Sequence, residues 1–138
     1  IGIDCSPRML AQAEKTGLYQ QLIAGDIVAE CRKLQPAFAL IIAADVLVYL
    51  GDLAPLFAAV RPLLTQGGLF AATVEEHHGT EDWFLQPQRR YAHSATYLRR
   101  LATAYDLQLR QLTECVPRTE KSQPVNGLLF LCHPAESK

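Results

Sequence analysis

The chain has 138 residues, of which 49% are hydrophobic and 20% are charged, and its formal net charge is −1 at pH 7. This length fits one domain with a core of its own. A net charge so close to zero gives no electrostatic footprint for nucleic acid or an anionic membrane, and no apolar stretch approaches the ~20 residues of a membrane span. The four cysteines lie far apart without a C-x-x-C pair, which is typical of reduced thiols in a cytoplasmic protein.

The first residues already have the composition of a β-strand. Residues 1–4 read Ile-Gly-Ile-Asp, and no Met precedes them. A domain normally begins with some dispensable residues before its first element, so this start indicates a piece of a longer protein. Ser6 as N-cap and Pro7 in the first turn predict a helix after this strand, and Gly17 predicts its end.

Two further strands follow in the first half of the chain. Residues 19–24 predict a short strand, and residues 27–34 predict a helix that Pro36 ends. Residues 38–44 form an apolar run too uniform for a strand with one wet face, so we expect helices on both sides of it. The run stops at Asp45, which either lies where doubly wound sheets bind ligands or caps the next turn.

The second half predicts a helix over 53–64, capped by Asp52 and closed near Pro62, and then a Gly-Gly turn at 67–68 into a strand over 69–74. Residues 75–94 are polar and aromatic, and a loop of this length in a compact domain is usually functional. Ser94 predicts the start of a helix, and strands over 107–116 and 125–133 predict a closing hairpin. The alternation predicts an α/β fold with a mostly parallel sheet and helices on both faces.

Four motifs along this pattern resemble those of class I S-adenosylmethionine-dependent methyltransferases. They lie at residues 3–13, 25–27, 38–50 and 66–70, in the order that the family has them, and Gln66 stands where the family usually has Pro. The resemblance covers nearly the whole chain. It implies a Rossmann-like fold, N-terminally incomplete, with 75–94 as an insertion on the substrate side.

The resemblance also implies which residues bind S-adenosylmethionine. Asp4, with Cys5 beside it, would accept hydrogen bonds from the ribose hydroxyls, since a carboxylate takes two donors at once. Met9 would pack on the adenine as a polarizable apolar plate. The adenine edge would bind Asp26 and the Ile27 backbone, and the methionine part would approach Ala44 and Asp45. The alternatives are a strand-end turn residue for Asp4, a core residue for Met9 and a loop residue for Asp26.

On the acceptor side, the resemblance implies a small molecule whose nitrogen, oxygen or carbon attacks the sulfonium methyl in line. Asp45 and His93 are the candidate bases, needed only if the acceptor carries a proton. Tyr49 and Tyr91 could orient the acceptor, together with Arg90, although residues 89–93 could equally be a solvated basic face. His77 and His78 are adjacent and cannot share a helical face, so we predict no metal site there.

The family's first strand and its Gly-rich loop should precede Ile1. In the family that strand lies between the strands that begin here at Ile1 and Phe38, so its loss would leave two buried edges unpaired. We therefore expect a truncated domain, impaired or inactive alone, that self-associates or rearranges.

Two other functions compete with this one. The first is a non-catalytic binding or assembly module with the same fold. The second is a nicotinamide-dependent dehydrogenase, against which the terminal hairpin and the turn at Gly67 argue.

Overall fold

The computed structural model describes residues 1–35 and 37–136 and divides into two compact units, Ile1–Gln35 and Pro36–Lys138. Pro36, predicted to end the second helix, lies outside the described residues. Among the described residues, no helix is long and apolar enough to cross a membrane.

The first unit is a strand-helix-strand-helix unit with two parallel strands. Its elements are β1 (Gly2–Asp4), α1 (Pro7–Thr16), β2 (Leu22–Ala24) and α2 (Ile27–Cys31), and β1 pairs with β2. Helix α1 begins as predicted, because the Ser6 side chain accepts a hydrogen bond from the Met9 backbone N–H at 3.3 Å. It ends at Gly17, whose φ of 66° is left-handed. Both predicted caps are therefore confirmed.

The second unit contains the larger sheet. Its elements are β3 (Phe38–Ala43), the short 3-10 helix η1 (Leu47–Tyr49), α3 (Ala54–Val60), η2 (Arg61–Leu63), β4 (Leu64–Glu76), β5 (Trp83–Leu85), β6 (Tyr91–His93), α4 (Ala95–Ala104), β7 (Leu107–Cys115), β8 (Thr119–Glu120), β9 (Gln123–Pro124) and β10 (Gly127–Pro134).

This sheet is mixed, so the prediction of a mostly parallel sheet is wrong. Strand β4 is parallel to β3 and β6, whereas β10 runs antiparallel between β4 and β7, and β5 is antiparallel to β6. The terminal hairpin was predicted and is present as β7 and β10. Strands β5 and β6 form inside the segment that was predicted to be a loop. The predicted turn at Gly67 and Gly68 lies within β4, where the register with β3 shifts and Gly67 has a φ of 79°.

The pairing of β4 places β6 directly beyond the end of β3. Strand β10 pairs with residues 70–75 of β4 on one edge. Strand β3 pairs with residues 64–72 and β6 with residues 75–76, so these two strands must share the other edge. The carboxyl end of β3 therefore faces the segment that carries β6.

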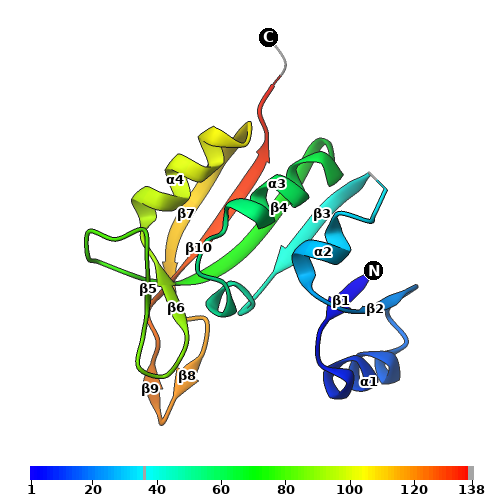
Figure 1. Ribbon diagram of the computed structural model, residues 1–138, viewed down its shortest axis with the longest axis horizontal. Coiled ribbons are helices and arrows are strands. Elements are labelled where there is room, and N and C mark those ends of the chain that lie inside the picture. The colour runs from blue at the N-terminus through cyan, green and yellow to red at the C-terminus, as the bar shows by residue number, and fades with distance from the viewer. Residues whose placement is uncertain (36, 137–138) are drawn as a thin grey trace. The chain divides into compact units, whose positions relative to one another are not determined.

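The core of the second unit lies between the sheet and two helices, α3 and α4, which contact each other over the same face (Figure 1). Phe57 of α3, Phe70 of β4 and Phe130 of β10 are fully buried, with ring centroids 5.6–6.0 Å apart. The opposite face carries Leu40 and Ile42, which remain 52% and 65% exposed. The predicted helices on both faces are therefore not seen among the described residues of this unit.

Candidate functional site

The chain leaves β3 through Asp45, the residue that the sequence placed at the strand tip. Asp45 has a left-handed φ of 54°, a conformation that Asp tolerates better than most residues, and its backbone N–H donates to Thr73 Oγ1 at 2.9 Å. Its side chain does not cap η1, which begins without a side-chain cap. The Asp45 carboxylate instead accepts a hydrogen bond from Arg118 at 2.6 Å and keeps a side-chain exposure of 42%.

Arg118 connects Asp45 to two other carboxylates. Its Nη2 donates to Glu75 Oε2 at 2.6 Å and its Nε donates to Glu120 Oε1 at 3.1 Å. Glu75 is only 3% exposed and also accepts from Gln86 Nε2 at 3.3 Å. A buried carboxylate needs such partners, because an unpaired buried charge is strongly destabilising. Sequence reasoning missed this cluster. Its available signal was Glu75, an acid directly after an apolar strand.

His93 is fully buried on β6 and holds the loop that follows η1. Its Nε2–H donates to the Gly51 carbonyl at 2.9 Å, since a carbonyl can only accept. Its Nδ1 has no hydrogen-bond partner among the described residues. Burial lowers the pKa of His93 below its usual value, although hydrogen bonding of the ring to the Gly51 and Leu50 backbone and the charge of Glu75 oppose the shift. The folded protein therefore favours the neutral form of the His93 imidazole.

The same loop is held a second time by helix α4. The Tyr97 hydroxyl accepts from the Leu53 backbone N–H at 2.9 Å and donates to Asp52 Oδ1 at 3.0 Å. Asp52 was predicted to cap helix α3, but the N-cap position is Leu53 and the helix has no side-chain cap. Asp52 Oδ1 instead accepts from the Ala54 backbone N–H at 2.9 Å. The loop after η1 is thus fixed from β6 and from the start of α4.

Because the pKa of His93 is lowered by folding, this residue should make stability depend on pH. Below about pH 6.5 the unfolded chain binds a proton at His93, whereas the folded chain binds it only at a lower pH. The stability that depends on neutral His93 is therefore present above about pH 6.5 and is lost as pH falls. We expect the melting temperature of the wild type to fall more steeply between about pH 7 and pH 5 than that of His93→Gln. The exposed His78→Gln is the matched control. Identical slopes for all three proteins would contradict this prediction.

The other predicted acceptor residues surround this loop. Tyr49 lies in η1 and is 65% exposed, and Tyr91 begins β6. The Arg90 side chain forms an ion pair with Glu120. A Cβ on Gly51 would contact the rings of Trp83 and Tyr91, so the loop packs directly against the aromatic side chains of β5 and β6.

In the first unit, both predicted cofactor carboxylates also stabilise the local backbone. Asp4 Oδ1 accepts from the Ser6 backbone N–H at 2.8 Å, and Asp26 Oδ2 caps α2 by accepting from the Ala29 backbone N–H at 2.8 Å. In each carboxylate the second oxygen has no partner among the described residues. Met9 is 51% exposed, so it is not a core residue of its helix. Cys5 is exposed and Ile27 is half-buried.

No protein-family model and no curated protein matches this chain. Solved structures do match. A crystal structure of an S-adenosylmethionine-dependent methyltransferase from Clostridium acetobutylicum ATCC 824 is 17% identical, with a TM-score of 0.71, over 97% of this chain and 74% of that one. The chain has the fold of the S-adenosylmethionine-dependent methyltransferases. The family resemblance of its motifs is thus supported at the level of the fold.

Two further methyltransferase structures give the same result. A Mesorhizobium loti S-adenosylmethionine-dependent methyltransferase is 19% identical, with a TM-score of 0.65, over 96% of this chain and 78% of that one. The Burkholderia thailandensis 1,6-didemethyltoxoflavin-N1-methyltransferase, crystallised with 1,6-didemethyltoxoflavin and S-adenosylhomocysteine, is 15% identical with a TM-score of 0.71. That match covers 97% of this chain and 60% of the Burkholderia enzyme.

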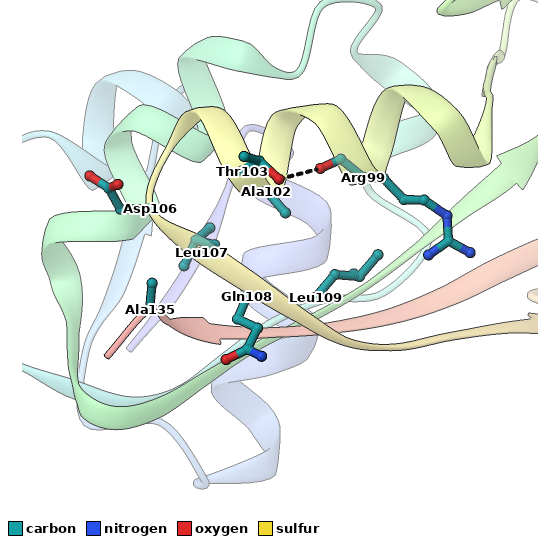
Figure 2. Close-up of a pocket in the computed structure, with 8 residues that line it drawn as sticks. All are labelled: Arg99, Ala102, Thr103, Asp106, Leu107, Gln108, Leu109 and Ala135. Carbon is teal, nitrogen blue, oxygen red and sulfur yellow. Dashed lines mark hydrogen bonds between the residues drawn. The ribbon is translucent and has the colours of Figure 1, made fainter. Parts of the chain in front are cut away.

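In this methyltransferase fold, one hollow of the second unit lies at the opposite end of the sheet from Asp45. A pocket of about 410 Å³ is lined by the last turns of α4 and the start of β7, including Arg99, Asp106 and Gln108 (Figure 2). Strand β7 starts opposite the end of β10, and β10 ends opposite the first half of β4, so this pocket is at the other end of the sheet. No group of three or more His, Cys, Asp or Glu side chains in the described ranges could hold a metal ion.

Proposed function

We propose that this chain belongs to an enzyme that transfers a methyl group from S-adenosylmethionine to a small-molecule acceptor. The observation that carries the proposal is the match over almost the whole chain to structures of S-adenosylmethionine-dependent methyltransferases. The Burkholderia enzyme, crystallised with 1,6-didemethyltoxoflavin and S-adenosylhomocysteine, supports the acceptor class. We also propose that the protein is cytoplasmic, and its free cysteines support this location.

The residues present fit the cofactor chemically. Asp4 and Asp26 each keep one carboxylate oxygen without a partner among the described residues, and Met9 is half exposed. Asp4 would bind the ribose hydroxyls, Asp26 and Ile27 the adenine edge, and Met9 the adenine face, with Cys5 beside Asp4. Ala44 and Asp45 would approach the methionine part. When bound, the cofactor supplies an activated methyl group on a sulfonium, so the protein contributes mainly alignment and exclusion of water.

Asp45 is the better candidate for a base on the acceptor side. Its side chain is partly exposed, whereas His93 is fully buried and its Nε2–H is donated to Gly51. We assign His93 to holding the loop after η1, with Tyr49, Tyr91 and Arg90 left to contact the acceptor. Geometry precedes pKa in such an assignment, because a base must reach the proton that it removes.

The proposal is tested by transfer of a labelled methyl group from S-adenosylmethionine to a panel of small heterocyclic and amine acceptors, with the complete protein. Asp45→Ala should reduce kcat by about 10²-fold if the acceptor carries a proton. His93→Ala should lower the melting temperature and leave kcat of the folded fraction within a few-fold. If no acceptor is methylated and no cofactor is bound, the proposed function is wrong. If His93→Ala abolishes turnover in a folded protein, our division of roles is wrong.

A second candidate function is an assembly module, favoured by the exposed side of β3. Within the described part of the second unit, β3 pairs with β4 alone. Leu40 and Ile42 pair with Leu69 and Ala71, so all four side chains lie on the face away from α3 and α4. An apolar strand with a free edge is a template for pairing with another chain. We take a second copy of this chain as the occupant.

Self-association of the 138-residue chain is therefore expected. Light scattering after size-exclusion chromatography should give at least the mass of a dimer, and Ile42→Lys should shift the chain to monomer, because a charge on an edge strand blocks pairing. Val116→Lys, at a residue that is also exposed, should leave the mass unchanged. A wild-type chain that is monomeric at every concentration would exclude the assembly module.

A further inference from the structure

Arg118 is placed by long-range contacts at the ends of strands β3 and β4. It lies between β7 and β8, yet its Nη1 reaches Asp45, 73 positions away in sequence, and its Nη2 reaches Glu75, 43 positions away. Both distances are 2.6 Å. The Arg118 side chain is only 14% exposed. Three charge-assisted hydrogen bonds hold the guanidinium more firmly than neutral hydrogen bonds would.

Each of the three guanidinium nitrogens of Arg118 donates to a different carboxylate. Glu75 is buried at the end of β4 and fixes the plane of the guanidinium through Nη2. Glu120 of β8 fixes it again through Nε. Nη1 is thereby aimed at the Asp45 carboxylate. The planar fork of Arg makes this possible, whereas a Lys ammonium is a point charge on a flexible stem and could not hold three carboxylates in fixed directions.

Asp45 is held independently at its backbone and at its side chain. Its N–H donates to Thr73, and its Oδ1 accepts from Arg118. The second carboxylate oxygen has no partner among the described residues, and the side chain is partly exposed. We propose that Arg118 is a positioning residue, which orients the Asp45 carboxylate so that its second oxygen meets the reacting partners. This inference deepens the proposed function and rests on it.

A purely structural role for Arg118 predicts something different. In that role Arg118 would tie the hairpin of β8 and β9 to the sheet. Its replacement would then lower kcat by the same factor in the wild type and in Asp45→Asn. A positioning role acts only through Asp45. The two roles are therefore separated by a double-mutant cycle between Arg118→Lys and Asp45→Asn.

The test uses the complete protein and any acceptor that it methylates. Arg118→Lys should lower kcat by about 10- to 100-fold with little change in KM, since misplacement of a group by about 1 Å costs this much. In the Asp45→Asn background, Arg118→Lys should cost less than about 2-fold. Arg110→Lys, on the exposed side of β7, should leave both parameters unchanged. Equal losses in the two backgrounds, or no loss at all, would overturn the inference.

A second measurement does not depend on turnover. Hydrogen exchange of the Asp45 amide should become several-fold faster in Arg118→Lys and remain unchanged in Arg110→Lys, because the side chain no longer restrains this residue. If the wild type binds no S-adenosylhomocysteine and methylates nothing, the proposed function fails, and with it the catalytic part of this inference. If the wild type is active but the exchange of Asp45 is unaffected by Arg118→Lys, the inference alone fails.

Discussion

Asp4→Asn is expected to weaken binding of S-adenosylhomocysteine to the complete protein by about 10- to 100-fold. A hydrogen bond to a charged group contributes about 1.5–3 kcal/mol, and each 1.4 kcal/mol is a factor of ten in affinity. Asn loses the charge and one acceptor oxygen. It keeps one oxygen for the Ser6 backbone N–H, so the start of α1 should survive.

Calorimetric titration measures this effect directly. Glu14→Gln is the matched control, since Glu14 is an exposed acid at the end of α1. It should bind with the wild-type dissociation constant. If Asp4→Asn and Glu14→Gln bind equally well, Asp4 is a turn residue only and the cofactor assignment in the first unit is wrong.

Arg118→Met is expected to lower the free energy of unfolding by about 3–5 kcal/mol. The substitution removes one partner of a buried ion pair and leaves Glu75, only 3% exposed, without its cation. Adding Glu75→Gln should restore most of the lost stability, because a pair of neutral side chains carries no uncompensated charge. Urea denaturation of the single and double variants measures both changes, with Arg110→Met as control.

Two other outcomes would assign a different role to the ion pair of Arg118 and Glu75. A loss below about 1 kcal/mol in Arg118→Met would place the pair in the class of solvated surface ion pairs. A double variant no more stable than Arg118→Met would show that packing of the guanidinium, and not charge, dominates. The size of the expected loss is the reason for testing the positioning role with Arg118→Lys, which keeps a charge beside Glu75.

Local features of the fold could be predicted from the sequence because they depend on a few neighbouring residues. Ser6 and Gly17 bound α1 as expected, and Ser94 caps α4 by accepting from the Tyr97 backbone N–H at 3.1 Å. Asp45 was also predicted to end its strand, since an apolar run that stops at an acid is visible in the sequence. These features need no knowledge of distant contacts.

Features that depend on pairing across the chain could not be predicted. The order of β6 beside β4 decides that His93 is buried, although its basic and aromatic surroundings suggested an accessible base. The partners of Asp45 were missed for the same reason. Arg118 lies in a short polar connection, and nothing local distinguishes it from an ordinary exposed Arg.

The central claim that we propose is that this chain belongs to an enzyme that binds S-adenosylmethionine. The most direct test is a titration of the isotope-labelled complete protein with S-adenosylhomocysteine, followed by the NMR shifts of its backbone amides. We predict saturable changes that are largest near Asp4, Asp26 and Asp45. Unchanged shifts at these residues, or changes confined to the pocket near Arg99 and Asp106 (Figure 2), would contradict the claim.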